Sequence, residues 1–389
     1  MTTRSGRASM TWAEVCARRL ERHALAAPAQ QAQPADIVAA ICGAHAQILS
    51  AGELSIGLRI AGLTRNDVQY ALWTEHSLIK TFGPRGTVHL LPARDLAMWT
   101  GALSAIPSAS SPFTPDVRMT AEQTEAVVAA IATALADAEL TIDELTEAVV
   151  SIAGAWAGDL VMPAFQVMWP RWRQAIDVAA QRGVLCFGPN RGRKITYANP
   201  RRWLPDFQPS AGRAALADLV RRYLYAYGPA TPQQFAQWLA APRGWAVELF
   251  GSLAGAIEQV EVDGALAWVA AGDSAASSAG PESVRLLPYF DAYTVGCHPR
   301  DRLFPGRAAE RALTNGQAGN FPVLLIDGMV AGVWNQRRSG RRIAIVVEPL
   351  DPLSAAQRRQ LDEQAERIGA FFEGEAQLTI GTVSVGPHA

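Results

Sequence analysis

The sequence predicts an α+β protein in which three tandem helix-and-hairpin units precede a C-terminal antiparallel β-barrel or sheet with a terminal helix. Two patterns support this fold class. Segments with apolar residues at helical spacing alternate three times with pairs of β-rich runs around a turn, although the units share no close sequence identity. A segment rich in Gly, Ser and Ala at residues 271–283 then separates them from a strand-rich part.

The composition indicates a multidomain globular protein. Of 389 residues, 49% are hydrophobic and 18% charged, and no run approaches the roughly 20 apolar residues of a membrane span. No secretory signal is recognisable, so we expect a cytoplasmic protein without membrane contact. Four scattered cysteines lack metal-ligand spacing, which predicts reduced thiols and no metal site. The net charge of -1 neither favours nor excludes a nucleic-acid partner.

The first unit, residues 34–110, follows an N-terminal helix and linker at residues 1–33. We predict one helix across PADIVAAICGAHAQIL and a second across TRNDVQYALWTEHSL, with Thr64 as its N-cap. The segment IKTFGPRGTVHLL predicts a hairpin that turns between Gly83 and Gly86.

The second unit, residues 111–209, contains the capping-box pair Thr141 and Glu144 at the start of a helix. The segment MPAFQVMWPRWRQAIDVAAQRG predicts a longer helix that is broken near Pro170. A hairpin is expected across VLCFGPNRGRKITYAN.

The third unit, residues 210–272, begins with the helix AALADLVRRYLYAYG, which Gly228 ends. TPQQFAQWL opens the next helix with Thr231 as cap, and RGWAVELFGSLAGAI follows it. The hairpin IEQVEVDGALAWVA turns at Asp263 and Gly264.

The C-terminal domain, residues 284–389, has three β-rich runs, VRLLPYF, FPVLLIDGMVAGVWNQ and RRIAIVVEPL. Asp327-Gly328 and Ser339-Gly340 are expected hairpin turns. The helix DPLSAAQRRQLDEQAERIGAFF and the strand AQLTIGTVSV complete this domain.

Two short helices and a β-hairpin form the supersecondary arrangement of a winged helix, whose second helix commonly enters a DNA groove. The same units also serve as protein-protein modules or rigid scaffolds. The pattern alone leaves these interpretations open.

The most unusual feature is the pair His45 and Gln47 within the apolar segment ICGAHAQILSAGELSIGLRI. These two side chains can hold and deprotonate a water molecule where a core residue would be expected. An unpaired buried polar group costs about 1–3 kcal/mol, so the pair requires an explanation. The structural alternative is a hydrogen-bonded core histidine beside a glutamine on a helix surface.

Several segments resemble the AlkZ-like (YcaQ-like) bacterial DNA glycosylase family, and their order and spacing make the match fairly specific. They are RRLERHAL, GAHAQILSAGELSIGLR, LWTEHSLIKTFGPRGTVHLLPARD, LLPYFDAYTVGCHPRDRL and LLIDGMVAGVW. The resemblance implies tandem winged helices, a C-terminal β-barrel and a short catalytic motif, usually Gln-x-Gln or Gln-x-Asp. His45 and Gln47 occupy the matching positions, so this chain looks like a His-x-Gln variant.

The resemblance implies a monomeric, monofunctional DNA glycosylase without cofactor or metal that acts on double-stranded DNA containing bulky alkylated purines. N7-alkylguanine adducts and interstrand crosslinks are included, and genotoxin self-resistance is the implied setting. A purine alkylated at N7 or N3 is already cationic and leaves as a neutral base. Catalysis then mainly requires delivery of water, which His45 could deprotonate or only bind, while Gln47 orients it.

The expected DNA contacts are cations on hairpin tips and one arginine after the motif. They are Arg59, Arg85, Arg191, Arg193, Lys194, Arg337, Arg338, Arg341 and Arg342. The turn QRRSGRR at residues 336–342 is the strongest candidate, because four cations surround a tight bend. Solvated, aggregation-resistant hairpin edges are the alternative, and Arg59 could instead form a structural pair.

Other polar residues receive structural interpretations. Gln31 and Gln33 form a literal Gln-x-Gln, but this pair lies too early, in a polar connection before the first unit. We expect His76 and His89 to pack in the first unit, and His298 to take part in an internal salt bridge near Asp291 and Arg300. The main alternative functions are a winged-helix transcriptional regulator without catalysis and a non-catalytic scaffold. A regulator would normally dimerise on a palindrome, and no dimerisation helix is apparent.

Overall fold

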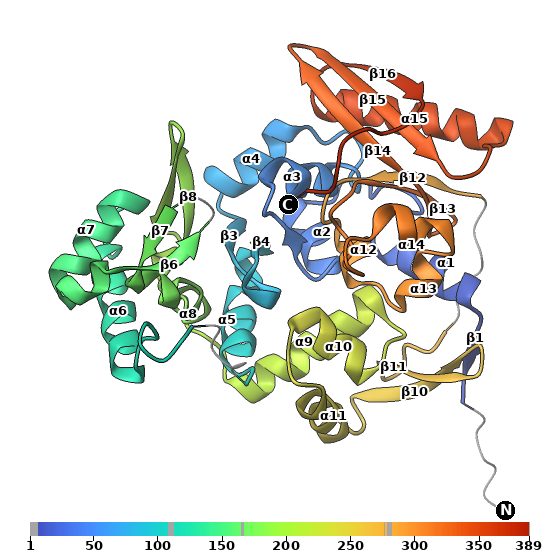
Figure 1. The fold of residues 1–389 in the computed structure, drawn as a ribbon. Helices are drawn as coiled ribbons and strands as arrows, with labels where there is room; N and C mark the ends of the chain where they lie inside the picture. Colours follow the sequence, from blue (N-terminus) through green and yellow to red (C-terminus); the bar gives the residue numbers. More distant parts are fainter. Residues whose placement is uncertain (1–6, 108–112, 165–166, 276, 278–281, 389) are drawn as a thin grey trace, which may run out of the picture. The chain divides into compact units, whose positions relative to one another are not determined.

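The computed structural model describes residues 7–107, 113–164, 167–275, 277 and 282–388 (Figure 1). The chain forms two compact units: unit 1 contains residues 1–71, 220–239 and 243–389, and unit 2 contains residues 72–219 and 240–242. The chain passes from unit 1 to unit 2 within helix α4 (Arg65–Trp73), and back to unit 1 within helix α9 (Gly212–Tyr227). The predicted boundary at residues 110 and 111 lies outside the described residues, as do residues 276 and 278–281 of the predicted linker. The five predicted domains stay predictions.

The C-terminal part of unit 1 is a five-stranded sheet in sequential strand order (Figure 1). Its strands are β12 (Val284–Leu287), β13 (Val323–Ile326), β14 (Met329–Ser339), β15 (Arg342–Pro349) and β16 (Glu375–Ile380). The first four strands pair antiparallel, as predicted. The antiparallel prediction is wrong for β16, which pairs parallel with β15. Helix α15 (Ala355–Phe371) lies between them in the chain and supplies the crossover that parallel strands need.

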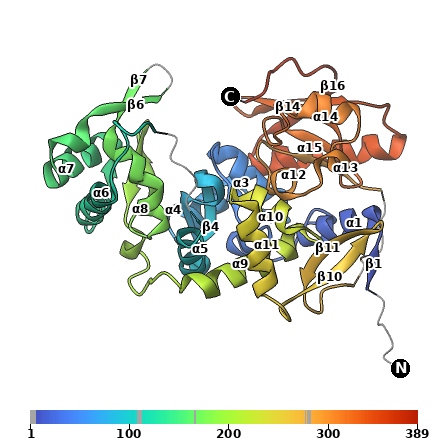
Figure 2. The same ribbon diagram turned by 60° about the horizontal axis from the view of Figure 1, so that its bottom comes forward.

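The remaining elements of unit 1 are helices and a second, smaller sheet. In that sheet β1 (Ser9–Met10) joins the predicted hairpin of β10 (Ile257–Val262) and β11 (Ala265–Ala270), as Figure 2 shows. The other elements of this unit are α1 (Trp12–Arg22), α2 (Pro34–Ala40), β2 (Ala44–His45), α3 (Leu49–Gly57), α10 (Pro232–Leu239), α11 (Arg243–Ser252), α12 (Ala292–Gly296), α13 (Arg300–Leu303) and α14 (Arg307–Ala312).

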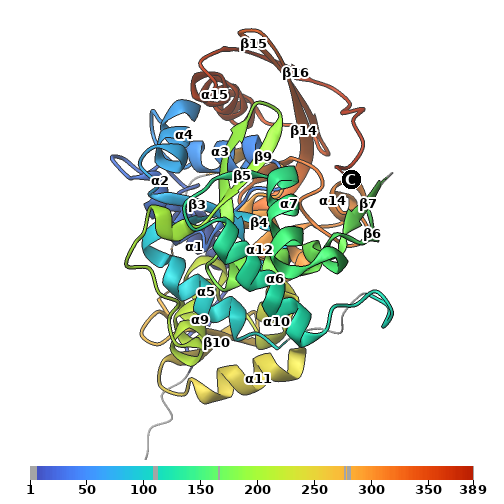
Figure 3. The same cartoon turned by 90° about the vertical axis from the view of Figure 1, so that its left-hand side faces the viewer.

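Unit 2 combines helices with three β-hairpins, and Figure 3 shows its helices α6 and α7 side by side. The hairpins are β3 (Leu78–Phe82) with β4 (Val88–Pro92), β6 (Leu160–Ala164) with β7 (Val167–Pro170), and β8 (Cys186–Arg191) with β9 (Lys194–Ala198). The other elements are α5 (Leu96–Ser104), α6 (Ala121–Ala134), β5 (Leu140–Thr141), α7 (Ile142–Ala153) and α8 (Ile176–Gln181). Its core gathers apolar side chains of α6, α7 and α8 around the fully buried Trp172.

Two helix predictions are wrong. The helix expected across residues 34–49 ends at Ala40, because Cys42 (φ 56°) and Gly43 (φ 96°) adopt left-handed backbone. The helix expected from Met162 is replaced in its first part by the hairpin of β6 and β7, and only residues 176–181 form the α-helix. Pro163 and Pro170 lack the N–H that a helix would need there, whereas a two-stranded hairpin tolerates both.

Several cap and turn predictions are confirmed. The Thr141 hydroxyl accepts the Glu144 N–H, and Gly228 directly follows the last residue of α9. Asp263 (φ 45°) and Asp327 (φ 51°) both adopt the positive φ of tight hairpin turns. Among the described residues, no helix is long and apolar enough to cross a membrane.

Candidate active site

The motif residues lie on a short turn of unit 1 between α2 and α3. The left-handed residues Cys42 and Gly43 end α2, and the chain then passes through the two-residue strand β2, which contains His45. Helix α3 packs closely on this turn, because a Cβ built on Gly52 would lie 2.8 Å from the His45 carbonyl oxygen. Only glycine permits this approach, so Gly52 fixes the backbone of the motif.

His45 is packed and Gln47 is exposed. The imidazole is 8% exposed and stacks on Phe290, with ring centroids 4.6 Å apart and an interplanar angle of 25°. The backbone N–H of Gln47 donates to His45 Nδ1 at 3.4 Å, which favours the neutral tautomer with hydrogen on Nε2. The arrangement therefore pairs a held imidazole with a solvent-accessible carboxamide two residues away.

Phe290 owes its position to a strained turn. It adopts φ 54°, and its N–H donates to the Gly319 carbonyl at 2.9 Å. Gly319 has φ 105°, and a Cβ there would lie 2.7 Å from the Phe290 ring. His388 from the C-terminal segment contacts the same ring edge-on, with centroids 5.6 Å apart. The platform under His45 is thus held by segments that are remote in sequence.

Asp291, the next residue, anchors this turn through a fully buried ion pair. Its carboxylate accepts two hydrogen bonds from Arg59, at 2.9 and 2.7 Å, and both side chains are 0% exposed. The Ser55 hydroxyl donates to the same carboxylate at 2.7 Å, and the Tyr293 N–H donates at 2.9 Å. Burial raises the pKa of Asp291, but Arg59 and the hydrogen bonds outweigh burial and hold the pKa below its ordinary value.

This geometry corrects one expected DNA contact. Arg59 cannot reach DNA, because it is enclosed and both terminal guanidinium nitrogens, Nη1 and Nη2, donate to Asp291; the structural alternative for this residue is confirmed. The ion pair found in this segment joins Asp291 to Arg59, and the expected salt bridge of His298 stays a prediction. Arg300 instead donates to backbone carbonyls, including that of Cys297, and the His298 carbonyl accepts from Arg19.

The four arginines of the β14–β15 turn form an exposed cationic feature of unit 1. We call them the basic hairpin tip: Arg337, Arg338, Arg341 and Arg342. All four are exposed, and no described carboxylate lies within ion-pair distance of them. Exposed guanidinium groups on a protruding strand pair can bind phosphates without first breaking an ion pair.

The other predicted cations belong to unit 2 and differ in their partners. Arg191 forms an ion pair with Glu144 at 2.9 Å, and Lys194 forms one with Asp143 at 2.8 Å. Arg193 is exposed between them, and Arg85 is half-buried at the β3–β4 turn with φ 62°. Exposed ion pairs contribute little stability, so these pairs do not prevent phosphate binding.

The remaining polar residues follow the structural interpretations. His76 stacks on Trp203 with centroids 4.2 Å apart, and His89 is buried with Nδ1 2.9 Å from the Thr87 carbonyl. Gln31 and Gln33 are exposed before α2. Sequence reasoning missed Phe290 and Ser55. Phe290 lies in the family-like segment LLPYFDAYTVGCHPRDRL, but no spacing rule relates it to His45.

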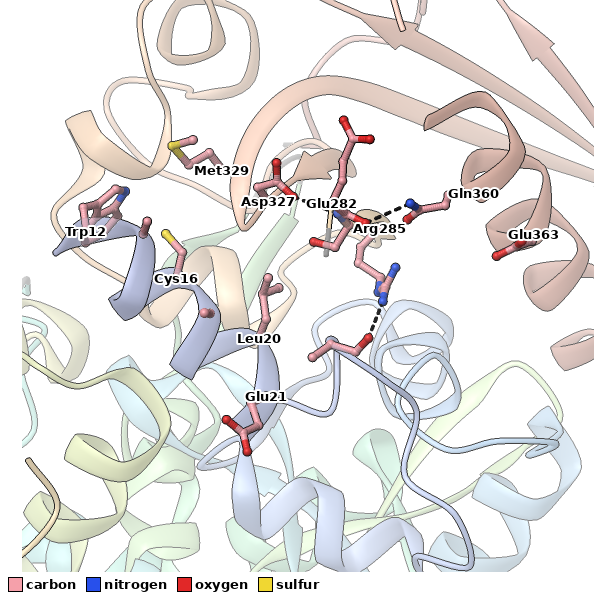
Figure 4. Close-up of a pocket in the computed structure, with 14 residues that line it drawn as sticks. Trp12, Cys16, Leu20, Glu21, Glu282, Arg285, Asp327, Met329, Gln360 and Glu363 are labelled. Atoms are coloured by element: carbon pink, nitrogen blue, oxygen red, sulfur yellow. Dashed lines mark hydrogen bonds between the residues drawn. The ribbon is translucent and has the colours of Figure 1, made fainter. Parts of the chain in front are cut away.

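A cavity of about 810 Å³ in unit 1 does not contain the motif (Figure 4). It lies beside α1, where Trp12, Cys16 and Leu20 provide apolar walls. Its charged lining consists of four carboxylates and one guanidinium: Glu21, Glu282, Asp327, Glu363 and Arg285. This excess of negative charge repels phosphates, so the cavity is not the DNA site.

Within the described residues, no group of three or more His, Cys, Asp or Glu side chains is placed to hold a metal ion. The four cysteines are buried and form no disulfide. The expectation of a reaction without metal or cofactor stays a prediction.

Known proteins share both the sequence and the fold of this chain. A family model described as DNA glycosylase AlkZ-like matches residues 38–371. The interstrand DNA cross-link repair glycosylase of Streptomyces sahachiroi is 31% identical over 339 residues, covering 83% of this chain and 87% of that protein. The solved structure of the Streptomyces sahachiroi DNA glycosylase AlkZ matches with a TM-score of 0.81 and 27% identity, over 96% of this chain and 100% of that one.

Proposed function

Because this chain belongs to the AlkZ-like family of DNA glycosylases, we propose that it hydrolyses the N-glycosidic bond of bulky alkylated purines in double-stranded DNA and leaves an abasic site. The observation that carries this proposal is the His45-x-Gln47 turn. It combines a clamped imidazole with an exposed carboxamide in the unit that also carries the basic hairpin tip. Membership in a glycosylase family argues against the regulator and scaffold alternatives.

The substrates are N7-alkylguanine adducts and interstrand crosslinks built from them. The Streptomyces relative is named for cross-link repair, and the two lesion types share one chemistry. In both, the alkylated purine is cationic and departs as a neutral base, so the enzyme needs no strong general acid.

The reaction then depends on water placed against the electron-poor anomeric carbon. The exposed Gln47 carboxamide orients that water through its carbonyl oxygen. His45 Nδ1 accepts the Gln47 N–H, so His45 donates from Nε2 to the water or to a phosphate and acts by positioning. Activity that stays constant on the acid side of the pH-rate profile supports positioning, whereas an acid-side fall would assign His45 as the base.

The protein holds DNA mainly through contacts with the phosphate backbone of the DNA. The basic hairpin tip binds phosphates on unit 1, and Arg85, Arg191, Arg193 and Lys194 add contacts from hairpins of unit 2. The helix-and-hairpin units act as winged helices, and the protein works as a cytoplasmic monomer without cofactor.

The test uses duplexes carrying either N7-methylguanine or a bulky intercalating N7-guanine adduct, followed by alkali to cleave abasic sites. Strand breaks are expected only after alkali, because hydrolysis leaves the DNA backbone intact. His45→Ala and Gln47→Ala should lose these breaks, whereas His45→Gln, which produces the more usual Gln-x-Gln motif, should retain activity.

Gln33→Ala is the matched control, since Gln33 is an exposed glutamine before α2. Thermal melting of each variant separates misfolding from lost chemistry. No breaks with any lesion in the wild-type protein, together with a footprint on one palindromic sequence, would refute the proposal and support a regulator.

A further inference from the structure

The segment that follows β16 leads back to the neighbourhood of the motif. We call residues 381–388 the C-terminal strap, which Figure 1 draws in dark red. Near its start Val383 is buried, and its N–H donates to the Glu348 carboxylate at 2.7 Å. At its far end the His388 N–H donates to the Asn320 carbonyl at 2.9 Å. The strap is thus fixed at both ends, and the stretch between these two anchors is exposed.

The ring of His388 contacts the platform under His45. Phe290 stacks on His45, with ring centroids 4.6 Å apart, and meets the His388 ring edge-on at 5.6 Å with an interplanar angle of 78°. Tyr289 is a second neighbour of His388, with ring centroids 5.7 Å apart. A continuous series of ring contacts therefore runs from the strap to the motif.

One turn holds the backbones of both Phe290 and His388. The Phe290 N–H donates to the Gly319 carbonyl, and the His388 N–H donates to the next carbonyl along, that of Asn320. Phe290 has φ 54°, a conformation that is costly for a non-glycine residue and persists only where surrounding contacts hold it. Contacts on the Phe290 ring are therefore needed to keep it in one orientation, and the His388 ring provides one of them.

The strap contributes little to the apolar core, because Val383 is its only buried residue. It also lies beyond residue 371, where the match to the family model ends, so family membership does not imply the contact between His388 and Phe290. We infer that His388 is a positioning residue for the reaction: its ring fixes the orientation of Phe290, and Phe290 holds the His45 imidazole in the orientation that excision requires. This inference rests on the proposed function and adds a residue to its site.

The test measures single-turnover excision from duplex DNA, with whichever of the two lesions named above the wild-type protein releases faster. An edge-on ring contact favours one orientation of its partner by roughly 3- to 10-fold, and His388→Ala should lower the rate by about this factor. The affinity for the same duplex, measured by fluorescence anisotropy, should stay at the wild-type value. His388→Phe keeps a ring against Phe290 and should retain the wild-type rate, as should the matched control Val385→Ala at an exposed position of the strap.

A double-mutant cycle shows whether His388 acts through Phe290. Phe290→Leu removes the ring that links His388 to His45, so His388→Ala should lower the rate no further in that background, whereas independent effects would multiply. Histidine-labelled protein gives a spectroscopic readout that does not depend on activity. The NMR signals of the His45 ring protons, which the stacked Phe290 ring shifts, should move in His388→Ala and stay in place in His388→Phe.

This inference would be overturned by an unchanged rate or an unmoved His45 signal in His388→Ala, by an equal loss of rate in His388→Phe or Val385→Ala, or by equal losses from His388→Ala in both backgrounds. In each of these cases the wild-type protein still releases the lesion, so the glycosylase proposal remains intact. Release of neither lesion by the wild-type protein would overturn both.

Discussion

The buried ion pair between Arg59 and Asp291 offers the sharpest test of how this site is built. Arg59→Met removes the guanidinium but keeps an unbranched side chain. The remaining carboxylate, 0% exposed, would keep only the Ser55 hydroxyl and the Tyr293 N–H as partners. Leaving one buried charge uncompensated costs about 3–5 kcal/mol, and we expect a loss of this size in the free energy of unfolding at neutral pH.

The assay is urea unfolding followed by tryptophan fluorescence, in a double-mutant cycle with Asp291→Asn. Asparagine removes the charge and still accepts a hydrogen bond from the Tyr293 N–H. The loss in the free energy of unfolding of the double variant should therefore be clearly smaller than the sum of the losses of the two single variants. In Arg59→Met only the hydrogen bonds from Ser55 and Tyr293 still oppose the desolvation that raises the pKa of Asp291, so partial protonation at pH 5 should shrink the defect. A loss below about 1 kcal/mol, or additive losses, would refute this account of the pair.

Three further predictions address the motif, the DNA contacts and the pH dependence of stability. Gly52→Ala places a methyl group 2.8 Å from the His45 carbonyl and should lower single-turnover excision by about 100-fold, whereas Gly251→Ala, a helical glycine with open space around it, should not. Replacing all four arginines of the basic hairpin tip with alanine should weaken DNA binding at low salt and flatten the salt dependence of the logarithm of affinity by roughly 0.9 per lost phosphate contact; an unchanged slope in fluorescence anisotropy titrations would exclude the tip. Burial and the nearby Arg59 lower the pKa of His23 to about 3, from 6.5, so the folded state binds fewer protons and wild-type stability should fall below pH 6.5. Between pH 7 and pH 5, the free energy of unfolding of His23→Leu, measured with urea, should fall by about 1–2 kcal/mol less than that of the wild-type protein. Equal falls in the two proteins would contradict this assignment.

Local elements of this fold could be predicted from the sequence because their signals are local. Thr141 and Glu144 form a capping box and Asp327-Gly328 forms a hairpin turn through interactions that span only a few residues. The motif positions His45 and Gln47 also came from the sequence, through their order among family-like segments. The helix predicted across them was wrong, because apolar periodicity does not reveal that Cys42 takes up positive φ.

What holds the motif in place was decided only by the tertiary structure. Phe290 stacks on His45, and Arg59 closes on Asp291, through contacts between segments far apart in the chain, and no spacing rule encodes them. The direction of β16 likewise follows from where α15 packs. Residue identity determined which side chains could perform chemistry. The packing of distant segments determined that Arg59 is buried and structural, and that the arginines of the basic hairpin tip face solvent.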